Sequence, residues 1–191
     1  MAFTYTIEPK FLTKEECDII LNFSLKNLMV ISPKVIYNDV EEINEVRKSN
    51  QVFFPYYKQF PFLLEKISKL LNKCIKFKGT DLDYEHSEFK FIEYNLGGYS
   101  DWHKDAYGEK ITNYDRYCSL VIQLNDEYEE GDLEIEITDG EILTVEKGTG
   151  NLILFLSDIK YRVAPVKSGN RYAIVNWVRL IEKKDYLKTL L

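Results

Sequence analysis

The sequence predicts a mainly β fold of the jelly-roll (double-stranded β-helix, cupin-like) type, with N-terminal helices packed on one sheet. Apolar residues recur at helical spacing only in the first part of the chain. From about residue 80 onward, short segments of strand character follow one another, separated by Gly, Asn and Asp turns. Helices followed by a series of short strands are typical of helices packed on a β-sandwich or jelly roll.

Two helices are expected before residue 80. Thr13 and Glu16 have the spacing of a capping box, and the apolar residues that follow predict a helix over about 14–26. Pro61 suits the start of a second helix. The Leu and Ile residues after it recur at helical spacing to about residue 73.

The remaining segments are expected to be strands. In residues 87–94, Phe89 and Phe91 alternate with charged neighbours, which indicates a strand. Turn residues such as Asp139-Gly140 separate further expected strands at about 117–124, 132–137, 141–145, 151–156, 161–166 and 171–179. The C-terminal segment, 181–191, is predicted to form a short amphipathic helix.

Composition narrows the class of protein. A length of 191 residues favours one domain over 1–191. The net charge of -6 and the lack of a basic segment argue against nucleic acid as a partner. Neither a signal peptide nor an apolar run that could cross a bilayer is present, so no membrane partner is expected. Three widely spaced cysteines predict reduced thiols and a cytoplasmic location, and no pattern indicates an oligomeric state.

His103 and Asp105 form the most informative short pattern. Residues two apart on a strand point to the same face, so an imidazole and a carboxylate can bind one cation. Nitrogen and oxygen ligands with open positions suit Fe(II). Many unrelated sequences contain a His two residues before an Asp, and a polar strand end at the surface is the default interpretation.

The surrounding segments change that interpretation. Residues 94–105 resemble the first metal motif of the 2-oxoglutarate/Fe(II) oxygenases, in the prolyl 4-hydroxylase-like (PKHD-type hydroxylase) branch. Segments 116–125 and 150–177 are similar to later strands of that family, in the same order and spacing. Residues 47–49 resemble an upstream strand. The resemblance therefore covers about residues 10–180.

The resemblance implies a ligand set. His103 and Asp105 would bind the metal, and Arg171 would bind the distal carboxylate of the cosubstrate 2-oxoglutarate through its planar guanidinium. Tyr94 resembles a tyrosine that lines the cosubstrate pocket, although a buried core tyrosine is an equally simple interpretation. Trp177 is expected to pack beside the site in a structural role. The role of Gln123 is open.

The sequence departs from the family at Tyr161, where the family has its distal histidine. His86 is the other histidine of the chain, and it lies too far along the same extended segment to reach the metal without folding back. In the first of three alternatives, Tyr161 binds as a phenolate, completes a His/Asp/Tyr set and favours Fe(III). In the second, Tyr161 turns away and water fills the position. In the third, the metal site is lost and the fold remains as a binding module.

The expected activity is oxidative decarboxylation of 2-oxoglutarate by O2, coupled to hydroxylation of a small-molecule or peptidyl substrate. Segments 34–58 and 106–115 are expected to set substrate choice, with Tyr107, Tyr114 and Arg116 as candidate contacts. A non-catalytic jelly-roll module and an Fe(III)-binding protein without turnover are the competing predictions.

Overall fold

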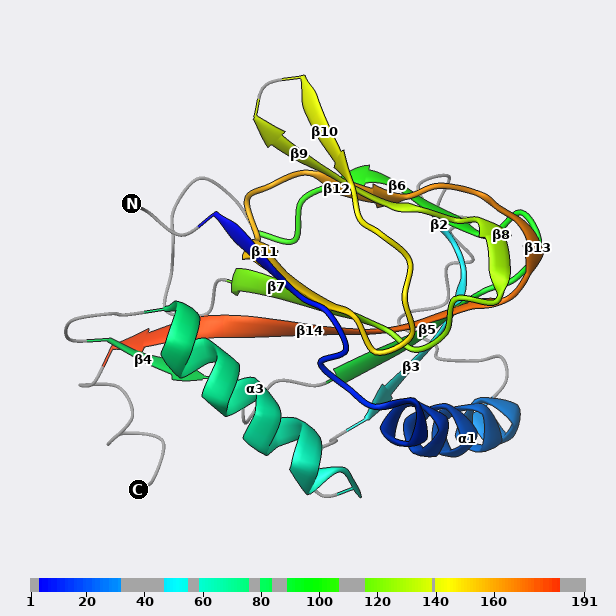
Figure 1. Ribbon diagram of the computed structural model, residues 1–191, viewed down its shortest axis with the longest axis horizontal. Coiled ribbons are helices and arrows are strands. Elements are labelled where there is room, and N and C mark those ends of the chain that lie inside the picture. The colour runs from blue at the N-terminus through cyan, green and yellow to red at the C-terminus, as the bar shows by residue number, and fades with distance from the viewer. Residues whose placement is uncertain are drawn as a thin grey trace, which may run out of the picture.

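The computed structural model describes residues 4–31, 47–54, 59–75, 80–83, 89–106, 116–138 and 140–182. Helices α1 (Lys14–Ile31) and α3 (Pro61–Cys74) lie on the same side of the largest sheet, and a second large sheet lies on its other side (Figure 1). The predicted mainly β fold, with helices packed on one sheet, is therefore confirmed.

Both helices begin as the sequence predicts. The Thr13 hydroxyl accepts a hydrogen bond from the Glu16 N–H at 3.2 Å, and the Glu16 carboxylate accepts one from the Thr13 N–H at 2.8 Å, so the capping box is present. Helix α3 starts at Pro61, and its apolar stripe is buried against the sheet. Neither helix has the length and apolar character that a membrane span would need, within the described residues. The expected cytoplasmic location stays a prediction.

Three antiparallel sheets form the β structure. The largest has seven strands: β1 (Tyr5–Glu8), β11 (Leu152–Leu156), β7 (Arg116–Gln123), β14 (Arg171–Glu182), β5 (Phe89–Tyr94) and β3 (Asn50–Phe54) in that order, with β4 (Thr80–Asp83) also paired to β14. The second has five, in the order β10 (Glu141–Thr144), β9 (Leu133–Thr138), β12 (Tyr161–Val163), β6 (Tyr99–His103) and β2 (Arg47–Lys48). Strands β8 (Tyr128–Glu130) and β13 (Val166–Gly169) form a small third sheet.

Two expectations about local structure need correction. The segment predicted as one strand over 161–166 is two strands, β12 and β13, which belong to different sheets. Pro165 lies between them, and it has no N–H to continue a ladder. The helix predicted over 181–191 is wrong at its start, because residues 181 and 182 extend β14 and pair with β4. The rest of that segment, 183–191, lies outside the described residues.

Apolar side chains form two layers, one on each face of the seven-stranded sheet. One layer joins that sheet to the helices, and the other lies between the two large sheets. Alternation along β14 assigns Ile174 and Val178 to the helix side, and Ala173, Val175 and Trp177 to the layer between the sheets. That inner layer also contains Tyr161 from the five-stranded sheet, so chemically active residues from both sheets share one interior.

Candidate functional site

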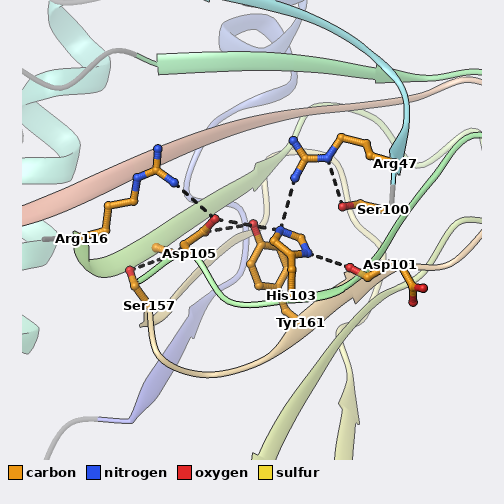
Figure 2. Close-up of polar contacts among 9 residues, drawn as sticks. Arg47, Ser100, Asp101, His103, Asp105, Arg116, Ser157 and Tyr161 are labelled. Carbon is orange, nitrogen blue, oxygen red and sulfur yellow. Dashed lines mark hydrogen bonds and ion pairs between the residues drawn. The ribbon is translucent and has the colours of Figure 1, made fainter. Parts of the chain in front are cut away.

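Three of the predicted site residues meet between the two large sheets. Tyr161 on β12 pairs in register with His103 at the end of β6, and Asp105 follows two residues later. The rings of His103 and Tyr161 have centroids 4.3 Å apart. Figure 2 shows the side chains of His103, Asp105 and Tyr161 directed toward one another.

His103 presents one ring nitrogen to the site. Its Nδ1 lies 2.7 Å from the Asp101 carbonyl oxygen, which can only accept, so Nδ1 carries the proton and Nε2 keeps a free lone pair. Nε2 lies 4.0 Å from Asp105 Oδ1 and 3.3 Å from a terminal nitrogen of Arg47, which can donate to it. Burial lowers the pKa of His103, and the Arg47 cation lowers it further, so the imidazole is neutral at pH 7.

Asp105 is the most heavily contacted residue of the group. Its side chain is 6% exposed, and its Oδ2 accepts hydrogen bonds from the Ser119 hydroxyl at 2.7 Å and the Tyr161 hydroxyl at 2.9 Å. Oδ1 faces the Arg116 guanidinium at 3.7 Å. The Asp105 N–H donates to the Ser157 carbonyl oxygen at 3.0 Å. Backbone and side-chain contacts together hold this carboxylate in one orientation.

Tyr161 acts as a hydrogen-bond donor in this arrangement. Its side chain is buried, and its ring packs edge-on against Phe155 with centroids 5.0 Å apart. Burial raises the pKa of Tyr161 well above its usual value near 10, and the adjacent Asp105 carboxylate raises it further. The phenol therefore keeps its proton and donates a hydrogen bond to Asp105. Coordination of a metal by Tyr161 stays a prediction.

Arg171 and Tyr94 lie together at one end of the interior. Arg171 pairs in register with Tyr94, and its guanidinium carbon is 5.2 Å from the centroid of the Tyr94 ring. The Arg171 side chain is only 1% exposed, and its Nε and one terminal nitrogen have no hydrogen-bond partner among the described residues. Both residues line a narrow cavity of about 10 Å³, together with Arg47 and Tyr161. Arg171 is therefore a buried cation, not a surface residue at a strand end.

A second group of residues surrounds Trp177, six positions further along β14. The Arg116 guanidinium lies 3.6 Å from the centroid of the Trp177 ring, and Lys90 Nζ lies 5.0 Å from it. Burial lowers the pKa of Lys90 to about 7, with Arg47 and Arg116 as nearby cations and Asp105 acting in the opposite direction. Trp177 is thus beside the site, as expected.

Other candidate residues lie elsewhere. The Gln123 side chain donates to the Glu146 carbonyl oxygen and accepts from the Gly148 N–H, so it holds a loop. Tyr107, Tyr114 and His86 lie outside the described residues. The sequence reasoning did not identify Lys90 or Ser119 as site residues. Neither has a signal in the sequence, because the alternation with Phe89 and Phe91 assigns Lys90 to the polar face of its strand.

The donor set around His103 can hold a cation. Among the described residues, no three His, Cys, Asp or Glu side chains gather at one point, so a protein-bound metal would rest on His103 and Asp105 with Tyr161 as the nearest further oxygen. Metal bonds to such ligands are about 2.0–2.2 Å long, so one cation can contact both across their 4.0 Å separation. One imidazole and one carboxylate suit Fe(II). The unpaired Arg171 suits a carboxylate ligand.

Comparison with known sequences relates the chain to one family. Residues 89–179 match the model described as the 2OG-Fe(II) oxygenase superfamily. A PKHD-type hydroxylase of Stenotrophomonas maltophilia is 35% identical over 108 residues, which are 53% of this chain and 47% of that protein. A PKHD-type hydroxylase of Parvibaculum lavamentivorans is 37% identical over 87 residues, 45% of this chain and 39% of that protein. The chain thus spans about half the length, or less, of these curated relatives.

Comparison with solved structures agrees on the fold. A Pseudomonas putida prolyl-4-hydroxylase has a TM-score of 0.70 at 19% identity, covering 93% of each chain. The viral collagen prolyl hydroxylase from Paramecium Bursaria Chlorella virus-1, as its 2OG complex, has a TM-score of 0.68 at 19% identity, covering 92% of this chain and 96% of that one. A Trichoplax adhaerens prolyl hydroxylase, bound to a hypoxia inducible factor peptide fragment, has a TM-score of 0.70 at 17% identity over 98% and 88%. These findings confirm the resemblance that the motifs predicted.

Proposed function

We propose that this chain, which matches the 2-oxoglutarate/Fe(II) oxygenase superfamily over residues 89–179, is an iron- and 2-oxoglutarate-dependent hydroxylase. When bound, the iron and 2-oxoglutarate would supply the reduction of O2 that is coupled to hydroxylation of a C–H bond. The substrate would be a small molecule or a peptide, and the prolyl hydroxylase bound to a peptide fragment supports a peptidyl one. The residues of this chain would bind, orient and shield these reactants.

The unpaired guanidinium of Arg171 is the observation that carries the proposal. Arg171 is buried, and two of its nitrogens have no partner among the described residues. A buried charge without a partner destabilises the folded state, so its presence favours a ligand that supplies the opposite charge. The planar fork of Arg binds a carboxylate through two parallel hydrogen bonds. We assign Arg171 to the distal carboxylate of 2-oxoglutarate, with the Tyr94 ring beside it. The cavity there is narrow, so the Arg47 side chain must move when 2-oxoglutarate enters.

His103 and Asp105 would hold the iron. The hydrogen bond from Nδ1 to Asp101 aims Nε2 into the site, and the contacts from Ser119 and the Asp105 backbone fix the carboxylate. Arg47 donates to the same Nε2 lone pair, so its guanidinium must leave before a metal can bind. The donor types favour Fe(II), and Fe(III) becomes favoured only if Tyr161 binds as a phenolate.

The part played by Tyr161 separates two forms of this proposal. Its hydrogen bond to Asp105 supports the form in which Tyr161 keeps its proton and water completes the coordination of the iron. The alternative is a phenolate ligand, which needs the charge of the metal to displace that proton. Visible absorption separates the two forms, because a phenolate bound to Fe(III) gives a charge-transfer band that Tyr161→Phe abolishes. Without such a band, Tyr161 acts through Asp105.

Calorimetric titration of 2-oxoglutarate into the Mn(II)-loaded protein tests the assignment of Arg171. Arg171→Leu should weaken binding about 100-fold, because two charge-assisted hydrogen bonds are lost. Arg171→Lys, the matched control, keeps the charge and should retain part of the affinity. Equal binding by wild type and Arg171→Leu would contradict the assignment. Succinate release from 2-oxoglutarate under air, with Fe(II), then tests turnover, and its absence would favour the non-catalytic module.

A further inference from the structure

The Trp177 end of the interior contains a second set of hydrogen-bond donors, about 20 Å along β14 from Arg171. Lys90 on β5 and Arg116 on β7 both approach the Trp177 ring, and β5 and β7 each pair with β14, one on either side. The three side chains therefore come from three adjacent strands. Their arrangement follows from the register of the sheet, and no loop is needed to bring them together.

Trp177 has an unsatisfied polar group, and Lys90 is a buried charge. Trp177 is 4% exposed, and its indole Nε1–H has no hydrogen-bond partner among the described residues. Lys90 is also 4% exposed, and within the described ranges no ion pair joins it to a carboxylate. Burying such groups without partners destabilises a fold. An indole N–H and an ammonium group can only donate, so the missing partner is an acceptor.

The charges around Lys90, Arg116 and Trp177 indicate that the missing acceptor is negatively charged. Four cationic side chains, those of Arg47, Lys90, Arg116 and Arg171, line or adjoin the interior. The carboxylate that faces them in the described part of the chain is Asp105, which is already bonded by Ser119 and Tyr161. 2-Oxoglutarate would neutralise the Arg171 end. At the Trp177 end, the Lys90 charge would still have no carboxylate partner within the described residues.

We propose that the organic substrate carries a carboxylate group that binds among Lys90, Arg116 and the Nε1–H of Trp177. This inference rests on the proposed function, because it assigns the substrate of the same site. Arg116 lies 3.7 Å from Asp105, so the carboxylate would bind next to a proposed iron ligand and hold a nearby C–H bond close to the metal. A free amino acid or other small acid could supply the group, and so could an acidic side chain of a peptide. An uncharged internal prolyl segment could not.

Nuclear magnetic resonance of the indole N–H groups provides a direct test. The chain has two tryptophans, so a Trp102→Phe variant identifies the Trp177 resonance. The protein would be loaded with diamagnetic Zn(II) and saturated with 2-oxoglutarate, which occupies the Arg171 end. It would then be titrated with N-acetylalanine and with the blocked peptide acetyl-Gly-Glu-Gly-amide. The uncharged controls are N-acetylalaninamide and the same peptide with Gln in place of Glu.

We expect the acids to shift the Trp177 resonance downfield and the matched amides to leave it in place. The acid that binds more tightly identifies the source of the carboxylate, terminal or side chain. Lys90→Met should weaken acid binding about tenfold or more, because a charge-assisted hydrogen bond is lost. Lys69→Met removes an equal charge from an exposed site on α3 and should leave binding unchanged.

Three results would overturn the inference: no shift with either acid, equal binding of acids and amides, or unchanged affinity in Lys90→Met. A titration of 2-oxoglutarate on the same Zn(II) sample reports on the proposed function separately. If 2-oxoglutarate binds and the acids do not, only the substrate inference fails. If the acids bind at Trp177 and 2-oxoglutarate does not bind, the carboxylate site stands and the hydroxylase proposal fails.

Discussion

The two large sheets contribute opposite kinds of chemistry to one interior. The seven-stranded sheet supplies donors and aromatic rings, from Tyr94 and Arg171 at one end to Lys90 and Trp177 at the other. The five-stranded sheet supplies His103 and Tyr161, and the chain continues from β6 to Asp105. One sheet is therefore suited to anions and the other to a cation. This division of roles means that a change in the metal ligands can leave the anion-binding side intact.

The two sheets also differ in how they are supported. The seven-stranded sheet packs on the helices through a continuous apolar layer. The five-stranded sheet carries ion pairs between its strands and the adjoining loop, such as Arg162 with Glu134 and Lys160 with Glu136. The departure at Tyr161 thus lies on the sheet that neither described helix covers, while Arg171 and Trp177 lie on the strand in the middle of the covered sheet.

Removal of the central carboxylate should have the largest effect, because it removes a buried negative charge that faces cations of both sheets. Asp105→Ala is expected to lower the free energy of unfolding by about 3–5 kcal/mol and to abolish metal binding. Urea denaturation and a metal titration measure the two effects. Glu134→Ala, in the half-buried pair with Arg162, should cost only about 1 kcal/mol, because water still screens that pair. An equal loss in the two variants would contradict the central role of Asp105.

Replacement of the buried lysine should stabilise the protein. Lys90→Met removes an uncompensated charge from the seven-stranded sheet and should raise the free energy of unfolding by about 1–4 kcal/mol at pH 6. The pKa of Lys90 is about 7 in the folded protein and 10.5 when unfolded. Between these two pH values, Lys90 is protonated in the unfolded chain and loses its proton in the folded protein. The free energy of unfolding of the wild type therefore rises with pH, and the stability gained by Lys90→Met becomes smaller.

Urea denaturation of the wild type and Lys90→Met at pH 6 and pH 9 measures the difference in their free energies of unfolding. Lys69→Met, at a lysine that is 74% exposed, is the control and should show neither the gain nor its pH dependence. A Lys90→Met variant that is less stable than wild type at pH 6 would show that Lys90 has a counterion in the folded protein.

Restoring a histidine should strengthen the cation-binding side alone. Tyr161→His adds an imidazole to His103 and Asp105, and we expect metal affinity to rise about tenfold or more. Affinity for 2-oxoglutarate at Arg171 should change little if the two sheets act separately. Fluorimetric metal titration and calorimetry measure the two affinities. Weaker metal binding in Tyr161→His than in wild type would show that the phenol oxygen is itself a ligand.

The smallest effect is expected from the hydroxyl of Tyr161. Tyr161→Phe removes one hydrogen bond to Asp105 and should cost about 0.5–1.5 kcal/mol in the metal-free protein, by urea denaturation. Ser119→Ala removes the other bond to the same oxygen and provides the matched comparison. If Tyr161→Phe lowers the free energy of unfolding much more than Ser119→Ala does, the two hydrogen bonds do not stabilise the Asp105 carboxylate equally.

Much of the fold could be predicted because local patterns specify it. The capping box at Thr13, the Pro61 start and the alternation around Phe91 each depend on neighbours in sequence. The strands β1 and β4 were not predicted, because they are short and lie at sheet edges where alternation is weak. The extension of β14 past residue 180 depends on pairing with β4, which no local pattern reveals.

Some residues of the candidate site could likewise be recognised in the sequence, and others could not. His103, Asp105 and Arg171 became candidates through the family resemblance of their segments, and their roles stay predictions. The contact of Arg47 with His103 depends on the pairing of β2 with β6, in which Arg47 pairs with Ser100. These two residues are 53 positions apart in the sequence, so no local pattern indicates the contact. Lys90 could not be identified either, because its burial beside Trp177 follows from the register of the sheet.

The hydrogen bond from Arg47 to His103 also has a consequence for how the site is loaded. Because the guanidinium and a metal need the same lone pair, metal uptake is an exchange and not a simple addition. The observed dissociation constant is then the intrinsic constant divided by the fraction of molecules in which Arg47 has left Nε2. At high metal concentration, the rate of uptake should level off at the rate at which the arginine departs. If the proposed metal site is correct, a strand of two residues at the edge of a sheet would therefore control how fast the metal binds.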